Sequence, residues 1–254
     1  MRVFIAGGTG HIGSYIIPEL VAAGHEVTGL ARSGKSADAL SALGAKVRRG
    51  DIADLEGLKA AAAQADGVIH VAHRQDLLPT GGIDAVAAAE LQIMLAYGAA
   101  LAGSGKPLVV SGSIGAPGWE NLGRPATEDD PSLPGGAAYK GTLRVRNAVE
   151  LAVIGLAERG VRAQIVRIPT IAHSTTDVAF LPLLIGLAKE KVSSVTRAKA
   201  RTCGPRCTPV TSPSCSAWRW NRVRPANTGT GSRAKASRSA PSPRRLAAAS
   251  ACRP

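Results

Sequence analysis

"GGTGHIG", residues Gly7–Gly13, is the stretch that decides how this chain is expected to fold. It follows a short apolar run at 2–6 and precedes a segment at 12–23 whose apolar residues recur with helical spacing. Glycines at GxxGxxG spacing between a strand and a helix permit a tight turn, a close approach of backbone N–H groups to a pyrophosphate, and close helix–strand packing. A bare structural turn is the alternative interpretation. The residues predicted to bind a dinucleotide here are Gly7, Thr9, Gly10, His11, Ile12 and Gly13.

Strand-like and helix-like segments alternate through the first 191 residues. Strands are predicted at 2–6, 26–31, 46–49, 67–71, 107–111 and 162–168, and helices at 12–23, 37–43, 55–63, 83–102 and about 139–159. Strands such as "GVIHVA" and "PLVVSGS" are uniformly apolar, which is typical of a parallel sheet covered by helices on both faces. The sequence therefore predicts an α/β fold with a doubly wound parallel sheet over residues 1–191.

The charge of the chain is concentrated in its last quarter. The 254 residues carry 31 Lys and Arg against 18 Asp and Glu, a net charge of +13, yet no acidic residue lies beyond Glu190. Residues 192–254 hold 13 of the basic residues, so the remaining 18 balance the 18 acids in 1–191. All four cysteines also lie in 192–254. This division predicts two regions of different character, and the overall charge does not indicate a nucleic-acid partner for the first of them.

Targeting and membrane segments are not predicted. The apolar run at 2–6 is too short for a signal peptide, and no later stretch reaches the roughly 18 uncharged apolar residues of a membrane span. A cytoplasmic protein without a membrane partner is the expectation.

The end of the second predicted strand bears on the choice of dinucleotide. An acidic residue that binds the ribose hydroxyls is expected there, but the sequence reads "TGLARSGKS", with Arg32 and Ser33 at that place and Lys35 behind them. A guanidinium fits a 2′-phosphate, so NADP(H) is favoured over NAD(H). An arginine that is merely solvated in a loop is the alternative.

Several sequence motifs, in the same order along residues 1–191, resemble those of a known protein family. "GGTGHIGSYIIPELVAAGHEVTGLAR", "GDIADLEGL", "DGVIHVAH", "PLVVSGS" and "GVRAQIVRIPT" resemble the NAD(P)-dependent epimerase/dehydratase branch of the short-chain dehydrogenase/reductase superfamily, close to its atypical members. The resemblance implies a Rossmann-like fold and an oxidoreductase or epimerase acting on a carbonyl, carbinol or sugar-like small molecule. It also implies that Asp51 and Ile52 flank the adenine, that Ala72 and His73 lie near the nicotinamide ribose, and that Pro169 lies by the carboxamide. For His70, a buried core histidine is the favoured interpretation.

The catalytic residues of this superfamily are only partly matched. Its usual chemistry uses a Tyr with a Lys four residues later and a Ser or Thr after the fifth strand; Ser113 matches the last of these. The Tyr and Lys positions fall on Thr142 and Arg146, so the dyad is absent in that register. If the helix begins early enough, Tyr139 lies one turn before Thr142 on the same face and is the other catalytic candidate. A non-catalytic NADP(H)-binding sensor is therefore the alternative function.

Residues 192–254 do not continue the α/β pattern. As written they read as an irregular, disordered basic tail, and the cysteine spacing is poor for zinc, so no metal site is predicted. Shifting the reading frame by one base permits Asn-Val-Trp-Pro-Ala-Val-His from "RTCGPRCT" (201–208), and an amphipathic helix with acids from "TSPSCSAWRW" (211–220). A frameshift at or just after Lys191 is the favoured interpretation, which makes an inactive product a further alternative. The nucleotide sequence around codons 190–196 tests it.

Overall fold

A computed structural model describes residues 1–113, 134–169 and 180–190, together with positions 124, 125, 127, 130, 132 and 172. The predicted tail at 192–254, and with it the frameshift interpretation, lies outside the described residues.

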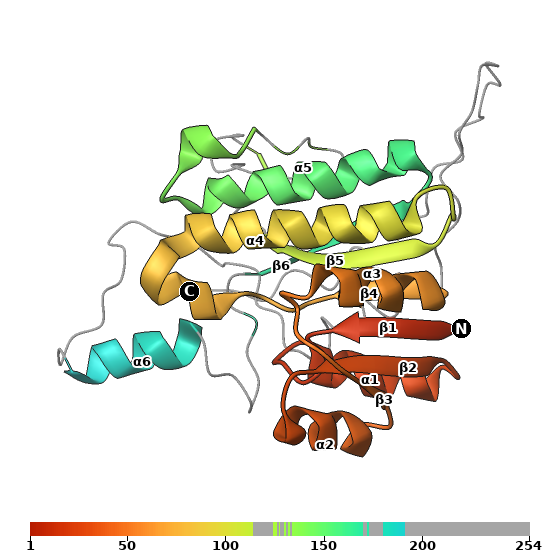
Figure 1. The fold of residues 1–254 in the computed structure, drawn as a ribbon. Coiled ribbons are helices and arrows are strands. Elements are labelled where there is room, and N and C mark those ends of the chain that lie inside the picture. Colours follow the sequence, from red (N-terminus) through yellow and green to blue (C-terminus); the bar gives the residue numbers. More distant parts are fainter. Residues whose placement is uncertain are drawn as a thin grey trace, which may run out of the picture.

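Six parallel strands form a single sheet (Figure 1). They are β1 (Arg2–Ala6), β2 (Glu26–Ala31), β3 (Lys46–Arg49), β4 (Gly67–His70), β5 (Pro107–Ser113) and β6 (Arg162–Ile168). Their order across the sheet is β3-β2-β1-β4-β5-β6, so the chain runs outward from β1 to one edge and then returns to build the other half. This reversal next to β1 is the doubly wound, Rossmann-like arrangement that the alternating pattern predicted. It brings the carboxyl ends of β1 and β4 together, where a ligand of such a sheet is expected to bind.

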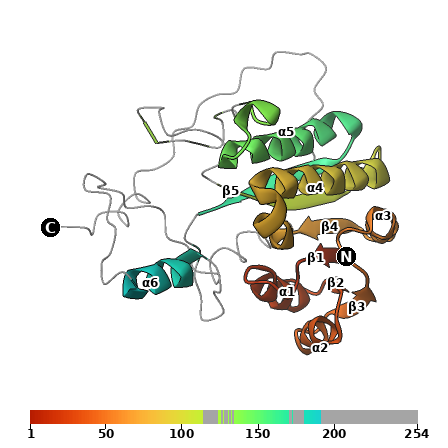
Figure 2. The same cartoon turned by 60° about the vertical axis from the view of Figure 1, so that its left-hand side comes forward.

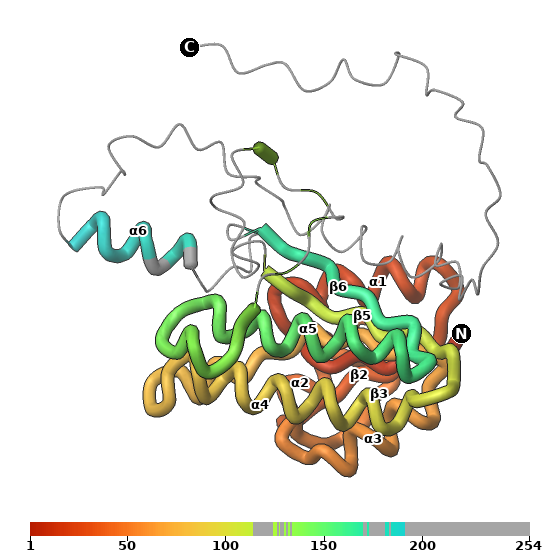
Figure 3. The backbone as a smooth tube through the Cα atoms, turned by 90° about the horizontal axis from the view of Figure 1, so that it is seen from above, coloured from red at the N-terminus to blue at the C-terminus, as the bar shows by residue number. Residues whose placement is uncertain are grey.

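Helices cover the sheet on both faces. They are α1 (Gly13–Ala22) and α2 (Gly34–Ala42) on one face, and α3 (Leu55–Gln64), α4 (Leu78–Leu101) and α5 (Asn147–Gly155) on the other. A further helix, α6 (Phe180–Glu190), lies apart from the sheet in Figures 1 and 2. Figure 2 shows α1 and α2 on one side of the sheet and α4 and α5 on the other, and α4 and α5 run side by side in Figures 1 and 3.

Two apolar cores hold these layers together. One lies between the sheet and α3, α4 and α5, and includes Phe4, Leu58, Tyr97 and Leu108. The other lies between the opposite face of the sheet and α1 and α2. Because the central strands contribute alternate residues to the two cores, they are apolar along their whole length, as the sequence showed. Burial of each large apolar side chain contributes about 1.5–3 kcal/mol to the free energy of folding. The packed sheet therefore holds the loops at its carboxyl edge in place.

The helix α4 lies in a long apolar segment. The segment Gln75–Leu101 is long and apolar enough to cross a membrane by length and composition, although Asp84 and Glu90 keep it short of the roughly 18 uncharged residues on which the expectation from the sequence rested. It bends at Gly82, whose φ is 63°, and its face formed by Ile93, Met94, Tyr97 and Leu101 packs into the core of the sheet. This packing is that of a core helix.

One correction concerns the helix predicted at about 139–159. The α-helix α5 begins only at Asn147. Before it the chain forms two separate 3-10 turns, η3 (Ala137–Tyr139) and η4 (Leu143–Arg146), divided by Gly141 with a φ of 73°. Tyr139 and Thr142 therefore do not share a face of one helix.

Candidate functional site

The glycine turn between β1 and α1 can be made only without side chains. Gly7 has a φ of +88°, and a Cβ added there would lie 2.5 Å from the backbone nitrogen of Ala72 in the neighbouring strand's loop. A Cβ on Gly13 would lie 2.1 Å from the carbonyl oxygen of Gly7. The N–H of Gly10 donates to that same carbonyl over 3.0 Å and closes the turn. Gly7 thus provides the tight turn and Gly13 the close helix–strand packing that the spacing suggested, whereas the approach of a pyrophosphate to Gly10 stays a prediction.

The amino end of α1 carries no side-chain cap. The side chain of its N-cap residue Ile12 accepts no hydrogen bond, and the N–H groups of Ser14 and Tyr15 donate to the carbonyls of Gly10 and Ile12. Such a helix end favours an anion such as a pyrophosphate. His11, also in the turn, donates from Nε2 to the carbonyl of Ala172 over 2.8 Å. This contact links the glycine turn to the segment that follows β6.

An open cleft of about 490 Å³ extends from this turn along the carboxyl ends of β2, β3 and β4. Eight residues predicted as cofactor contacts line it: Gly7, Thr9, Arg32, Ser33, Asp51, Ile52, Ala72 and His73. Lys35, Ser36, Gln75 and Asp76 also line the cleft, and of these the sequence had indicated only Lys35. Gly10, His11, Ile12 and Gly13 form the adjoining turn, whereas Pro169 follows β6 and does not line the cleft.

Hydrogen bonds hold the backbone at the basic end of the cleft in place without a ligand. Ser33 caps α2 in a reciprocal capping box with Ser36, and the guanidinium of Arg49 donates to the carbonyl of Ser33. These bonds fix the backbone on the carboxyl side of Arg32. Arg32 itself is exposed and makes no hydrogen bond within the described part of the chain. Its guanidinium is therefore available to an anionic group of a ligand.

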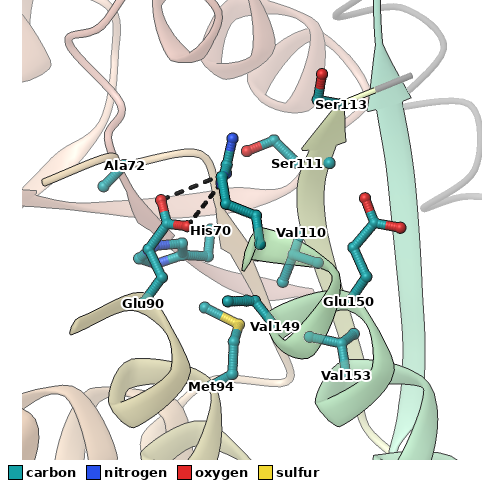
Figure 4. Close-up of a pocket in the computed structure, with 12 residues that line it drawn as sticks. His70, Ala72, Glu90, Met94, Val110, Ser111, Ser113, Val149, Glu150 and Val153 are labelled. Carbon is teal, nitrogen blue, oxygen red and sulfur yellow. Dashed lines mark hydrogen bonds and ion pairs between the residues drawn. The ribbon is translucent and has the colours of Figure 1, made fainter. Parts of the chain in front are cut away.

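A second, smaller hollow of about 20 Å³ adjoins the cleft at Ala72, which lines both (Figure 4). It is lined by His70, Ala72, Glu90, Met94, Val110, Ser111, Gly112, Ser113, Arg146, Val149, Glu150 and Val153. Ser113, the candidate catalytic serine, lies at its upper end, at the end of β5 (Figure 4). The volume suits a group the size of one water molecule. The structure thus brings Ser113 close to the end of the cleft at Ala72.

Glu90 on α4 is the residue that the sequence reasoning missed. Its carboxylate is 5% exposed and accepts hydrogen bonds from Arg146, at 3.1 Å from Nε and 3.4 Å from Nη2. The other neighbour is His73, whose Nε2 lies 3.4 Å from Glu90 Oε1. A single carboxylate in the apolar stretch 85–101 was the available signal, because an acid is buried there only when it is paired.

A second buried ion pair flanks the hollow. Glu150 on α5 accepts from Arg167 on β6, at 3.1 Å from Nε and 3.0 Å from Nη2, and the two side chains are only 7% and 18% exposed. Arg167 also donates to Ser132 Oγ over 2.7 Å. Gly112 of β5 makes room for this pair, because a Cβ there would lie 2.7 Å from Glu150 Oε1. The pair therefore joins α5 to the edge of the sheet beside Ser113.

Tyr139 is not brought to this hollow. It lies in η3, where its ring packs against the guanidinium of Arg144 at 3.9 Å from the ring centroid. Thr142 is exposed, and its hydroxyl donates to the carbonyl of Tyr139. Neither side chain lines the hollow that contains Ser113. The expectation that Tyr139 reaches the catalytic space through a shared helix face is wrong because that helix starts eight residues later.

His70 is a buried core histidine, as the sequence favoured. It is 4% exposed, and its Nδ1 lies 3.3 Å from the hydroxyl of Tyr97. Burial lowers the pKa of His70 to about 4 and raises the pKa of Tyr97. Groups of three or more His, Cys, Asp or Glu suited to a metal ion do not occur in the part of the chain that the structure describes.

The lowered pKa of His70 predicts a loss of stability in mild acid. The unfolded chain, with a histidine pKa near 6.5, binds the proton more readily than the folded one, so the contribution is complete above pH 6.5 and is lost as the pH falls towards 4. Over that range we expect the free energy of unfolding to drop by about 3 kcal/mol on this account. Urea unfolding of wild type and His70→Gln at several pH values measures it; equal pH slopes for the two proteins would contradict the prediction.

Comparisons with known proteins agree with this geometry. Residues 7–129 match a family model described as NAD(P)H-binding. An uncharacterized protein of Schizosaccharomyces pombe is 36% identical over 208 residues, which cover 81% of this chain and 65% of that protein. A 4-hydroxy-2-methyl-3-oxo-4-farnesyl-3,4-dihydroquinoline-1-oxide ketoreductase of Stigmatella aurantiaca is 30% identical over 206 residues, 75% of this chain and 56% of that protein. The chain thus spans less than two thirds of the length of these relatives.

Among solved structures, UDP-glucose 4-epimerase of Thermus thermophilus in complex with NAD superimposes with a TM-score of 0.62 at 22% identity, covering 88% of this chain and 75% of that one. The fold, the glycine turn and the family match define an NAD(P)-binding α/β protein of the Rossmann type. At 22% and 15% identity, the solved 4-epimerases share this fold with the chain.

Proposed function

We propose that this chain binds NADP(H) and transfers a hydride between the nicotinamide and a carbonyl or carbinol carbon of a small molecule, sugars included. The observation that carries the proposal is the junction at Ala72, where the cleft that begins at the glycine turn meets the hollow that contains Ser113. A cofactor lying along the cleft would present its reactive end to that hollow. One relative is a ketoreductase and several structural neighbours are 4-epimerases, and both activities are consistent with such chemistry.

The chain's own residues would divide the binding of the cofactor among them. N–H groups of the turn and of α1 would bind the pyrophosphate, and Arg32 with Lys35 would bind a 2′-phosphate. Asp51 is held by a hydrogen bond from the N–H of Ala53 to its Oδ1, at 2.9 Å, and with Ile52 would flank the adenine. By the resemblance, Ala72 and His73 would contact the nicotinamide ribose and Pro169 the carboxamide.

Ser113 is the residue that we propose to orient the substrate. Its hydroxyl can donate to a carbonyl oxygen and so favour the negative charge that develops there as hydride arrives. Tyr139 stays a candidate from the sequence, but its packing against Arg144 favours a structural role. The bound dinucleotide would supply the hydride itself; the protein would supply position, exclusion of water and a proton.

Two experiments test this function. The first is a titration with NADPH, and the second measures consumption of NADPH with a broad panel of small aldehydes, ketones and keto-sugars. We expect saturable binding and substrate-dependent loss of absorbance at 340 nm. Absence of NADPH binding would overturn the proposal.

The preference for NADP(H) predicts a selective effect at Arg32. Arg32→Ala should weaken NADPH binding by about 10- to 100-fold, because a charge-assisted bond to the 2′-phosphate is lost, and should leave NADH binding nearly unchanged. Arg159→Ala removes one exposed arginine far from the cleft, at the end of η5 (Leu156–Arg159), and is the matched control for net charge. Equal losses for NADPH and NADH in Arg32→Ala would contradict the assignment.

A non-catalytic NADP(H) sensor is the second candidate. The observation that favours it is the occupation of the Tyr and Lys positions by Thr142 and Arg146. Tight NADPH binding without turnover on the whole panel, unchanged by Tyr139→Phe, would favour the sensor over the enzyme.

We also propose that the protein is cytoplasmic, without nucleic-acid or membrane partners. For residues 192–254 we propose the frameshift interpretation.

A further inference from the structure

The buried carboxylate of Glu90 connects the cleft to the hollow. His73, which it contacts, comes from the loop after β4 and lines the cleft, with its side chain 28% exposed. Arg146, which it also binds, comes from η4 and lines the hollow together with Ser113. Figure 4 shows the carboxylate of Glu90 rising from α4 towards Ala72, where the two spaces meet.

The arrangement leaves one nitrogen of each partner of Glu90 without a hydrogen bond among the described residues. Arg146 uses Nε and Nη2 on Glu90, and within the described ranges its Nη1 makes no hydrogen bond. His73 has Nε2 next to Glu90, while its Nδ1 is buried and lacks a hydrogen-bond partner among the described residues. A buried imidazole nitrogen without a partner is costly, and a ligand oxygen would satisfy it.

We propose that His73 exchanges the proton with the substrate oxygen, with Glu90 as the residue that positions it and Arg146 as the cation that stabilises the oxygen's negative charge. This inference rests on the proposed function. A carboxylate that holds one imidazole nitrogen while the other exchanges a proton is an effective way to orient a histidine for acid–base chemistry. In this way the chain would replace a Tyr and Lys dyad that it lacks.

The proposed step balances. In reduction, the hydride pair moves from the dihydronicotinamide to the carbonyl carbon and forms a C–H bond, the π pair of the C=O bond moves to oxygen, and that oxygen takes the proton from Nδ1 of charged His73. The neutral imidazole then regains a proton from solvent. In oxidation, neutral His73 takes the hydroxyl proton at Nδ1 as the hydride leaves the carbinol carbon for the oxidised nicotinamide.

The charges that surround His73 determine its pH behaviour. The charged or titratable neighbours that act on it are His70 on β4, Glu90 on α4 and Arg146 on η4. Burial lowers the pKa of His73, Glu90 opposes this, and Arg146 adds to it. Because reduction needs the charged imidazole and oxidation the neutral one, reduction should slow and oxidation should accelerate as pH rises through this pKa. Glu90→Gln removes the opposing carboxylate, so it should move both limbs to lower pH.

The experiment compares wild type, His73→Gln, Glu90→Gln and the control His25→Gln. His25 lies just before β2, at the opposite edge of the sheet from the cleft. We expect His73→Gln to lower kcat by about 100- to 1,000-fold and to lose the pH limb; because His73 would also contact the nicotinamide ribose, kcat is measured at saturating NADPH. NMR titration of the His73 imidazole, which does not depend on turnover, should show a lower pKa in Glu90→Gln than in wild type.

The outcomes separate the inference from the function on which it rests. Unchanged kcat and an intact pH limb in His73→Gln would overturn the inference while leaving the oxidoreductase proposal standing. An unchanged His73 pKa in Glu90→Gln would overturn it even without a substrate. A wild-type protein that binds NADPH but reduces nothing would instead overturn the proposed function, and the proton role with it.

Discussion

Gly13→Ala should abolish measurable NADPH binding. The added Cβ would lie 2.1 Å from the Gly7 carbonyl oxygen and 2.7 Å from Gly8 Cα, both backbone atoms of the turn that would hold the pyrophosphate. To relieve this contact, α1 must move away from β1, and its N–H groups must move away from the phosphates. We expect a loss of at least about 100-fold in affinity, or about 3 kcal/mol, and a fall of about 1–3 kcal/mol in the free energy of unfolding. Calorimetric titration and urea unfolding measure the two effects.

Gly155→Ala is the matched control for this substitution. Gly155 ends α5 with a helical φ of −62°, and nothing lies within 4 Å of an added Cβ. Alanine there should leave NADPH binding unchanged and slightly raise stability, since glycine is a poor helix former. NADPH binding by Gly13→Ala equal to that of wild type would show that the turn does not hold the pyrophosphate.

Glu150→Ala should cause the largest loss of stability among single substitutions outside the glycine turn. It removes the carboxylate that neutralises Arg167 where both side chains are largely buried. Breaking such a pair from one side costs about 3 kcal/mol or more. Because the pair joins α5 to β6 beside Ser113, turnover should fall as well.

Two further variants make this prediction specific. Glu150→Gln keeps the shape and one acceptor oxygen, so it should lose less stability than Glu150→Ala. Glu26→Gln removes one partner of the exposed Lys46–Glu26 pair and should produce no measurable change. If Glu150→Ala unfolds at the same urea concentration as Glu26→Gln, the ion pair beside the hollow does not stabilise the fold.

The sheet and the glycine turn could be predicted because their signals are local. Each central strand is a short apolar run, and "GGTGHIG" places the turn between β1 and α1. The strand order then follows from the handedness and the reversal common to such folds. Eight of the residues predicted as cofactor contacts line one cleft, because loops at the carboxyl ends of neighbouring parallel strands converge.

The contacts of Glu90 and the position of Tyr139 could not be predicted in the same way. Contact between Glu90 and Arg146 spans 56 residues of sequence and depends on how α4 crosses beneath η4. The late start of α5 follows from Gly141 at a φ of 73° and the extended Thr142, which interrupt the helical path, whereas the apolar periodicity alone suggested a helix from 139. Tyr139 was therefore placed by a helix that does not form there, and Glu90 was overlooked because its partners are distant in sequence.

Transfer of deuterium from NADPH labelled at the reactive C4 position tests the central claim most directly. The wild-type chain would be incubated with the labelled cofactor and the panel of small carbonyl compounds, and the masses of the products would be measured by mass spectrometry. We predict an alcohol product with one deuterium on the former carbonyl carbon. Recovery of the labelled NADPH unchanged, from protein that demonstrably binds it, would contradict the claim that this site transfers hydride.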